Sequence, residues 1–101
     1  MEAKIDRKLV AIMFNDIVGY TALMQTNEKR AFKQKARHSA VFQEQHELFD
    51  GLIIQYHGDG TLSVFNSVVK VSECAIQIQL TPAGEEIINL KIVIRFESIF
   101  F

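Results

Sequence analysis

Two aspartates are the residues whose type and position suit chemistry. Asp16 follows the apolar run of residues 9–14, and Asp59 lies in the Gly-Asp-Gly sequence of residues 58–60. Two carboxylates that lie close together raise each other's pKa unless a cation lies between them. Mg²⁺ is typically held by one or two carboxylates together with the phosphate oxygens of a substrate. If the fold brings the two aspartates together, they predict a site for a divalent cation.

The segment directly after Asp16 adds a second feature. Its five residues are Ile17, Val18, Gly19, Tyr20 and Thr21. Where a chain enters a helical turn, backbone N–H groups can point at phosphate oxygens, and glycine has no side chain to block that approach. Together with the aspartates, this segment predicts a metal–triphosphate site. The alternative is that both aspartates are ordinary turn residues, because aspartate is common at strand ends and in glycine turns.

Apolar patterning indicates which elements position these residues. Residues 9–14 are continuously apolar, as in a strand buried on both faces, and residues 90–96 alternate. Gly58 and Gly60 favour a tight hairpin between two further strands. Strands are therefore expected at 9–15, 52–57, 61–65 and 90–96, and helices at 28–49 and 67–80, with a short helical turn at 21–25 as a further option.

The element order β–α–β–β–α–β is that of the ferredoxin-like α+β fold, with an antiparallel four-stranded sheet and two helices on one face. The strands at 9–15 and 90–96 are expected to be central. The first and third strands can be neighbours in this fold, and that pairing would bring Asp16 and Asp59 to one end of the sheet.

Composition limits the class of protein. The chain has 101 residues, 49% of them hydrophobic and 23% charged, which suits one domain with one core. A net charge of −1 gives no electrostatic footprint for nucleic acid or an anionic membrane. Cys74 is the single cysteine, which excludes an internal disulfide. We therefore expect a cytoplasmic domain with no nucleic-acid or membrane contact.

Two motifs resemble a known family. Residues 14–21 read Phe-Asn-Asp-Ile-Val-Gly-Tyr-Thr, similar to the F-x-D-I-x-G-[FY]-T signature of class III nucleotidyl cyclases, the adenylate and guanylate cyclase catalytic domains. Residues 58–80, from the Gly-Asp-Gly turn through Val64, Phe65 and Ser67 to Cys74, Ala75, Ile78 and Gln79, are similar to the family's middle segment. The resemblance covers about residues 8–80 and, more weakly, 90–95.

The resemblance implies an activity and a site. Class III cyclases convert a nucleoside triphosphate into a 3′,5′-cyclic nucleotide and pyrophosphate for signal transduction. The implied ligands of two Mg²⁺ or Mn²⁺ ions are Asp16, Asp59 and the backbone carbonyl of Ile17. The implied nucleotide-binding residues are Ile17, Val18, Gly19, Tyr20, Thr21, Gln55 and Gly58. The family's sites lie between two domains packed head to tail, so a homodimer or oligomer is implied, with ATP favoured as the substrate.

Departures from the family pattern bear on turnover. Gln55 stands where many members have a base-contacting lysine, so the choice between ATP and GTP stays open. The family's later asparagine and arginine have no match among the 101 residues, and residues 95–101 replace its Gly-containing turn. We therefore expect residues 1–101 to be one truncated domain that is almost inactive alone. The alternatives are a nucleotide- or metal-binding module without turnover and a dimerisation domain without a ligand.

Three further side chains have a structural interpretation. His38 and His46 are eight residues apart on the expected long helix, two turns from each other, which disfavours a shared metal ion. Cys74 falls on the apolar face of the second helix and is expected in the core.

Overall fold

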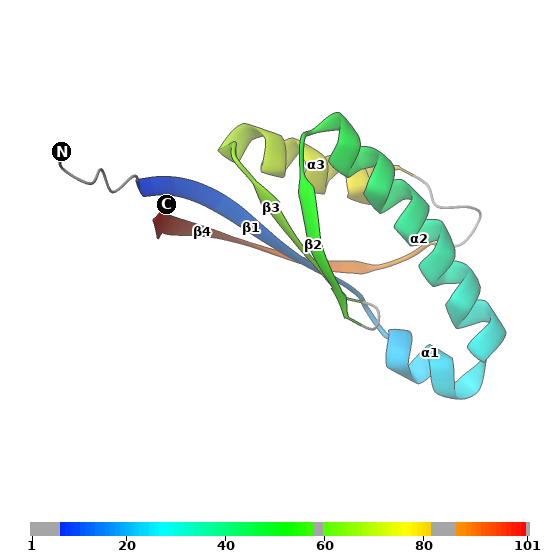
Figure 1. Cartoon of the computed structure of the whole chain (residues 1–101). Helices are drawn as coiled ribbons and strands as arrows, with labels where there is room; N and C mark the ends of the chain where they lie inside the picture. The colour runs from blue at the N-terminus through cyan, green and yellow to red at the C-terminus, as the bar shows by residue number, and fades with distance from the viewer. Residues whose placement is uncertain (1–6, 58–59, 82–86, 101) are drawn as a thin grey trace, which may run out of the picture.

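The computed structural model describes residues 7–57, 60–81 and 87–100, which form seven elements (Figure 1). The strands are β1 (Arg7–Ile17), β2 (Leu52–His57), β3 (Gly60–Phe65) and β4 (Leu90–Phe100). The helices are α1 (Tyr20–Thr26), α2 (Glu28–Leu48) and α3 (Val68–Leu80). The short helical turn after β1 is thus a seven-residue helix, and β4 continues four residues beyond its expected end.

The four strands form one antiparallel sheet in the order β2-β3-β1-β4. Helices α2 and α3 lie over one face of this sheet (Figure 1), so the expected ferredoxin-like α+β architecture is confirmed. The first and third strands are neighbours, as expected. The expectation that residues 90–96 form a central strand is wrong, because the hairpin places β3 between β2 and β1 and leaves β4 at the edge of the described sheet.

The pairing of β1 differs on its two sides. Its register with β4 runs from Arg7 opposite Phe100 to Ile17 opposite Leu90. Its register with β3 covers only residues 11–15, where Asn15 lies opposite Thr61. The first residues of β1 and the last residues of β4 therefore continue past β3 as a two-stranded ribbon (Figure 1).

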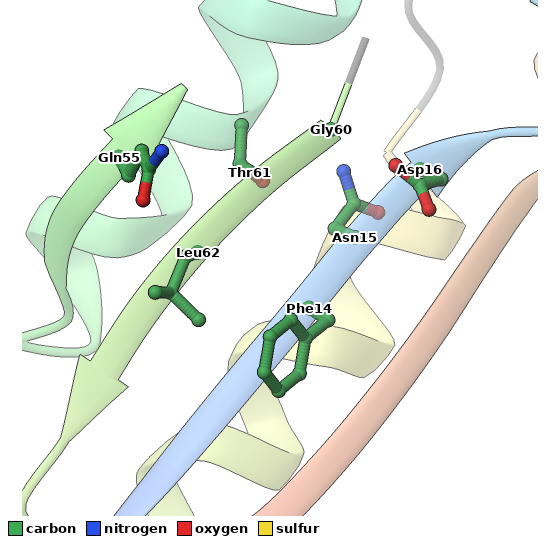
Figure 2. Close-up of a pocket in the computed structure, with 7 residues that line it drawn as sticks. All are labelled: Phe14, Asn15, Asp16, Gln55, Gly60, Thr61 and Leu62. Carbon is green, nitrogen blue, oxygen red and sulfur yellow. The ribbon is translucent and has the colours of Figure 1, made fainter. Parts of the chain in front are cut away.

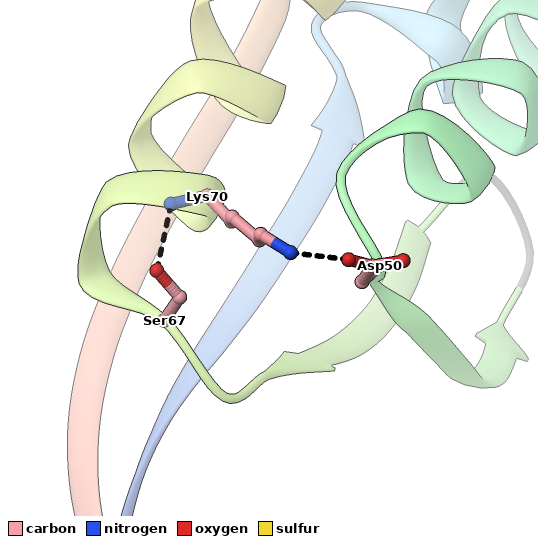
Figure 3. Close-up of polar contacts among 3 residues, drawn as sticks. All are labelled: Asp50, Ser67 and Lys70. Carbon is pink, nitrogen blue, oxygen red and sulfur yellow. Dashed lines mark hydrogen bonds and ion pairs between the residues drawn. The ribbon is translucent and has the colours of Figure 1, made fainter.

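Capping side chains define where the two long helices begin. The side-chain oxygen of Asn27 accepts a hydrogen bond from the Arg30 backbone N–H at 3.1 Å, which caps α2. Ser67 caps α3 in the same way by accepting from the Lys70 N–H at 3.2 Å. The Lys70 ammonium also pairs with the Asp50 carboxylate (Figure 3). Both of these side chains are well exposed, so the pair adds little stability.

The main core lies between the sheet and the two long helices. Its buried members are Ala11, Met13, Phe42, Phe65, Val71, Cys74, Ala75 and Ile78. The imidazole of His46 is also buried there, with its ring centroid 4.0 Å from that of Phe42 and 5.2 Å from that of Phe65. A smaller cluster of Ile17, Tyr20 and Ala31 joins α1 and α2 to the end of β1. Within the described residues, no helix is both long enough and apolar enough to cross a membrane.

The turn between α2 and β2 needs glycine for space. A Cβ atom on Gly51 would lie 2.5 Å from Phe65 Cζ and 2.6 Å from His46 Cδ2. We expect Gly51→Ala to lower the free energy of unfolding by about 1–3 kcal/mol, the usual effect of overpacking. Urea denaturation followed by circular dichroism measures this change.

Phe65→Leu supplies the matched background for this prediction. Because leucine leaves room beside residue 51, the Gly51→Ala change should cost clearly less in that background than in the wild-type chain. Equal costs in the two backgrounds would contradict the packing explanation.

Candidate functional site

A pocket of about 400 Å³ lies at the end of β1 (Figure 2). It is lined by Phe14, Asn15, Asp16, Gln55, Gly60, Thr61 and Leu62. Successive side chains of a strand point to opposite faces of a sheet. Because Met13 is buried against the helices, Phe14 and Asp16 face the other way, away from them. The pocket is therefore built where three strands meet on the helix-free face.

Asp16 contributes the acidic group among the described residues that line this pocket. Its side chain is exposed, and its carboxylate makes no hydrogen bond or ion pair with the residues that the structure describes. The strand partner of Asp16 is Lys91 on β4. An exposed carboxylate that is not used by another side chain is a suitable oxygen ligand for a hard cation.

The second predicted aspartate cannot be compared directly, because Gly58 and Asp59 lie outside the described residues. Gly60, the residue after Asp59, begins β3 and lines the same pocket as Asp16. The pairing of the two carboxylates therefore stays a prediction. Within the described part of the chain, no group of three or more His, Cys, Asp or Glu side chains could hold a metal ion.

Gln55 on β2 and Asp16 on β1 lie on opposite sides of the pocket, and β3 runs between their strands (Figure 2). An irregularity in the pairing of β2 with β3 occurs between Ile53 and Gln55, and Gln55 then pairs with Leu62. This irregularity puts Gln55 on the same face as Phe14 and Leu62. The pocket thus combines a carboxylate, a neutral amide and two apolar side chains.

The predicted phosphate-binding segment divides into packing and exposed residues. Ile17 and Tyr20 are buried in the smaller core cluster, whereas Val18 and Thr21 are exposed. Gly19 has φ 76°, a left-handed conformation that glycine adopts without strain. The Val18 N–H donates to the Asn89 carbonyl at 2.8 Å, so it is already occupied by a backbone acceptor.

Sequence reasoning did not single out the buried residue of the pocket, Asn15. It is 1% exposed, and its Nδ2 donates to Nε2 of His38 at 2.7 Å. His38 is itself 5% exposed, and burial lowers its pKa to about 4. The sequence does contain a signal for this residue: alternation along β1 puts Asn15 on the same buried face as Met13, where a polar side chain needs a partner.

The other candidate side chains have core partners. His46 Nδ1 donates to the Phe42 carbonyl at 2.7 Å, and burial lowers the pKa of this imidazole. Burial raises the pKa of the Cys74 thiol to about 12, so the thiol is neutral at physiological pH. The two histidines therefore bond to different partners, one in the pocket wall and one within α2.

Comparison with known proteins shows which proteins this chain resembles in sequence. No protein-family model matches the sequence. Among curated proteins, it matches "Putative adenylate cyclase 3" of Rhizobium meliloti (strain 1021) with 37% identity over 81 residues. That match covers 79% of this chain but only 14% of the length of the relative.

Solved cyclase structures share the fold. The guanylyl cyclase Cya2 superposes with a TM-score of 0.77 at 20% identity, covering 94% of this chain and 57% of that chain. The guanylate cyclase domain of RhGC from Catenaria anguillulae, in complex with GTP, gives a TM-score of 0.77 at 17% identity, covering 95% of this chain and 59% of that chain. The resemblance to class III nucleotidyl cyclase domains is therefore confirmed, in sequence by the curated relative and in fold by these structures.

The buried imidazole of His38 predicts a pH dependence of stability. Between about pH 4 and 6.5 the unfolded chain binds a proton at His38 that the folded chain does not. The free energy of unfolding should therefore fall as the pH drops from 6.5 towards 4, by up to ~3 kcal/mol from this group.

Urea denaturation at a series of pH values tests this prediction. The His38→Gln variant is the matched control, because glutamine does not titrate and should make that part of the profile less steep, while the contribution of His46 remains. Parallel profiles for the wild-type chain and the variant would show that His38 is not the group responsible.

Proposed function

We propose that this chain is the nucleotide- and metal-binding part of an adenylate/guanylate cyclase domain, the type of domain that forms a 3′,5′-cyclic nucleotide and pyrophosphate from a nucleoside triphosphate. The observation that carries the proposal is the pocket whose lining combines the exposed Asp16 carboxylate and the Gln55 amide with the apolar side chains of Phe14 and Leu62. The sequence relationship to an adenylate cyclase supports the same function.

The donors available at this pocket fit a hard divalent cation. The Asp16 carboxylate is exposed and engages none of the described side chains. Asp16, the backbone carbonyl of Ile17 and Asp59 would hold two Mg²⁺ or Mn²⁺ ions together with the nucleotide phosphates. When bound, such ions supply charge neutralisation at the phosphates and a lower pKa for the ribose 3′-hydroxyl.

The other residues of the pocket would bind and orient the nucleotide. Gln55 offers both an N–H donor and a carbonyl acceptor to the edge of a purine base. Phe14 and Leu62 present apolar surface that can exclude water from beside the base. Of the two purine nucleotides, we favour ATP, in line with the curated relative. We further propose a homodimer, as the family resemblance implies.

A second candidate function is binding without turnover. The 101 residues contain no Asn-x-x-x-Arg sequence, the pattern expected of a turnover-competent member. Losing one donor that stabilises a transition state commonly costs 10²–10³ in rate. We therefore expect the 101-residue chain alone to make almost no cyclic nucleotide, although it binds the substrate. Robust production of cyclic AMP or cyclic GMP by the chain would reject the binding-only alternative.

Asp16→Asn tests the proposed cation site. The substitution keeps the size of the side chain but removes its charge. We expect the affinity for Mn²⁺–ATP to fall at least about tenfold, since contacts to a charged group are worth roughly 1.5–3 kcal/mol. Isothermal titration calorimetry on the folded chain measures this affinity.

Glu97→Gln is a control for the loss of one negative charge on the same sheet. Glu97 lies on β4 opposite Val10, far along the strand from Asp16, and its carboxylate pairs with Arg95. Its variant should bind Mn²⁺–ATP like the wild-type chain. Equal affinities for the wild type and Asp16→Asn would remove Asp16 from the site.

Gln55→Ala tests base recognition. Losing the amide should weaken binding of ATP about three- to tenfold, because each neutral hydrogen bond is worth roughly 0.5–1.5 kcal/mol. Inorganic tripolyphosphate with Mn²⁺, which has no base, should bind the variant and the wild type equally. A similar loss for both ligands would place Gln55 at the phosphates instead.

A further inference from the structure

The end of β1 is tied to α2 by one buried hydrogen bond. Asn15 Nδ2 donates to His38 Nε2 at 2.7 Å, and the two residues are 23 positions apart in the sequence. Asn15 immediately precedes Asp16 and lines the same pocket. Its side chain points to the helix side of the sheet, whereas that of Asp16 points to the opposite side. The bond therefore links a helix behind the sheet to the strand that carries the acidic group in front.

Asn15 has no second side-chain bond to hold it among the described residues. Its Oδ1 is buried without a partner, and so is Oγ1 of Thr61, its neighbour on β3. A buried amide that is satisfied on one side only depends on that one bond for its orientation. His38 is therefore the group that fixes the Asn15 side chain.

The backbone around Asp16 has less strand pairing than the backbone before it. The described pairing of β1 with β3 ends at Asn15 and Thr61, so Asp16 has a strand partner on β4 but none in the described part of β3. The next backbone anchor is the bond from the Val18 N–H to the Asn89 carbonyl, also on the β4 side. On the β3 side, the pairing of Asn15 with Thr61 is thus the last described attachment before Asp16, and the Asn15 side chain adds a bond to α2 at the same residue.

We propose that His38 is a positioning residue for the pocket: by accepting the amide of Asn15, it holds the end of β1 so that Asp16 faces the bound cation and nucleotide. The orientation of Asp16 toward a cation and nucleotide rests on the proposed function, whereas the role of His38 in holding the end of β1 does not.

The protonation state of His38 suits this role. A neutral imidazole offers one nitrogen as an acceptor, and the Asn15 amide nitrogen can only donate. Burial lowers the pKa of His38 to about 4, so the ring is neutral at pH 7 and Nε2 can accept. The ring also packs near Phe42, with centroids 5.7 Å apart, so an apolar replacement keeps that contact while removing the acceptor.

The test compares four changes in the full chain. His38→Leu and His38→Phe remove the acceptor, and two shapes are used in case one variant fails to fold. His38→Gln restores an acceptor at similar reach. His46→Leu is the matched control, because His46 is buried on the same helix and bonds to Phe42 instead of to Asn15.

The first readout is hydrogen exchange of the Val18 amide, measured by NMR without ligand. We expect exchange about tenfold faster in His38→Leu and His38→Phe than in the wild type, since a buried bond worth roughly 1–3 kcal/mol is lost. His38→Gln should exchange near the wild-type rate. Exchange rates are compared after subtracting the change in global stability, for which His46→Leu supplies the reference.

The second readout is the affinity for Mn²⁺–ATP. It should fall about tenfold in the two apolar variants, recover in His38→Gln and be unchanged in His46→Leu. Wild-type exchange at Val18 in the apolar variants, or an equal effect in His46→Leu, would overturn the positioning role. If the wild-type chain does not bind Mn²⁺–ATP, the proposed function fails, and the exchange data still decide whether His38 holds the strand end.

Discussion

The antiparallel pairing of β1 with both β3 and β4 is the constraint on which the rest of the structure depends. It fixes the alternation along β1, so that Met13 and Asn15 face the helices while Phe14 and Asp16 face the opposite side. A shift of one residue in this register would exchange the two sets, burying a carboxylate and exposing a core methionine. The two faces of β1 therefore contribute to the core and to the pocket, and one register decides which residues enter each.

The two faces differ in how they are stabilised. On the helix side, the buried core, which includes Met13, Phe42 and Phe65, excludes water, and its burial is the main favourable contribution to folding. Polar groups on this side need partners, and Asn15 finds only one in His38. On the open side, Asp16 and Gln55 keep their polar atoms exposed, so they stay available to a ligand. An incompletely satisfied amide behind an unpaired carboxylate is the kind of local cost that functional sites tolerate.

Much of the architecture could be predicted from the sequence, because it depends on local patterning. Three predicted features correspond to observed elements: the long helix of residues 28–49, the antiparallel pair of strands at 52–57 and 61–65, and the strand formed by the apolar run of residues 9–14. The placement of Asp16 at a strand end followed from the same patterns. The resemblance to cyclases also came from short motifs, since Gly19 and its neighbours are close together in the chain.

Features that depend on the choice of partner could not be predicted in this way. The alternation of residues 90–96 is the same for a central strand and for an edge strand, so the position of β4 was misjudged. The bond between Asn15 and His38 joins residues from different elements, and its length depends on how α2 packs across the sheet. The irregularity before Gln55 likewise has no local signal, although it decides which face that amide occupies.

The ribbon formed by β1 and β4 has a consequence for how this protein behaves in concentrated solution. Along β4 the described structure has a strand on one side only, so the other edge presents a row of unpaired backbone N–H and C=O groups. Leu9 and Phe96 are largely exposed on the same ribbon. An open edge flanked by apolar side chains is a template for adding strands from further molecules, and growth by such addition has no built-in end. A strand added at this edge would lie beside β4, on the opposite side of β1 from the strands β2 and β3 that line the pocket.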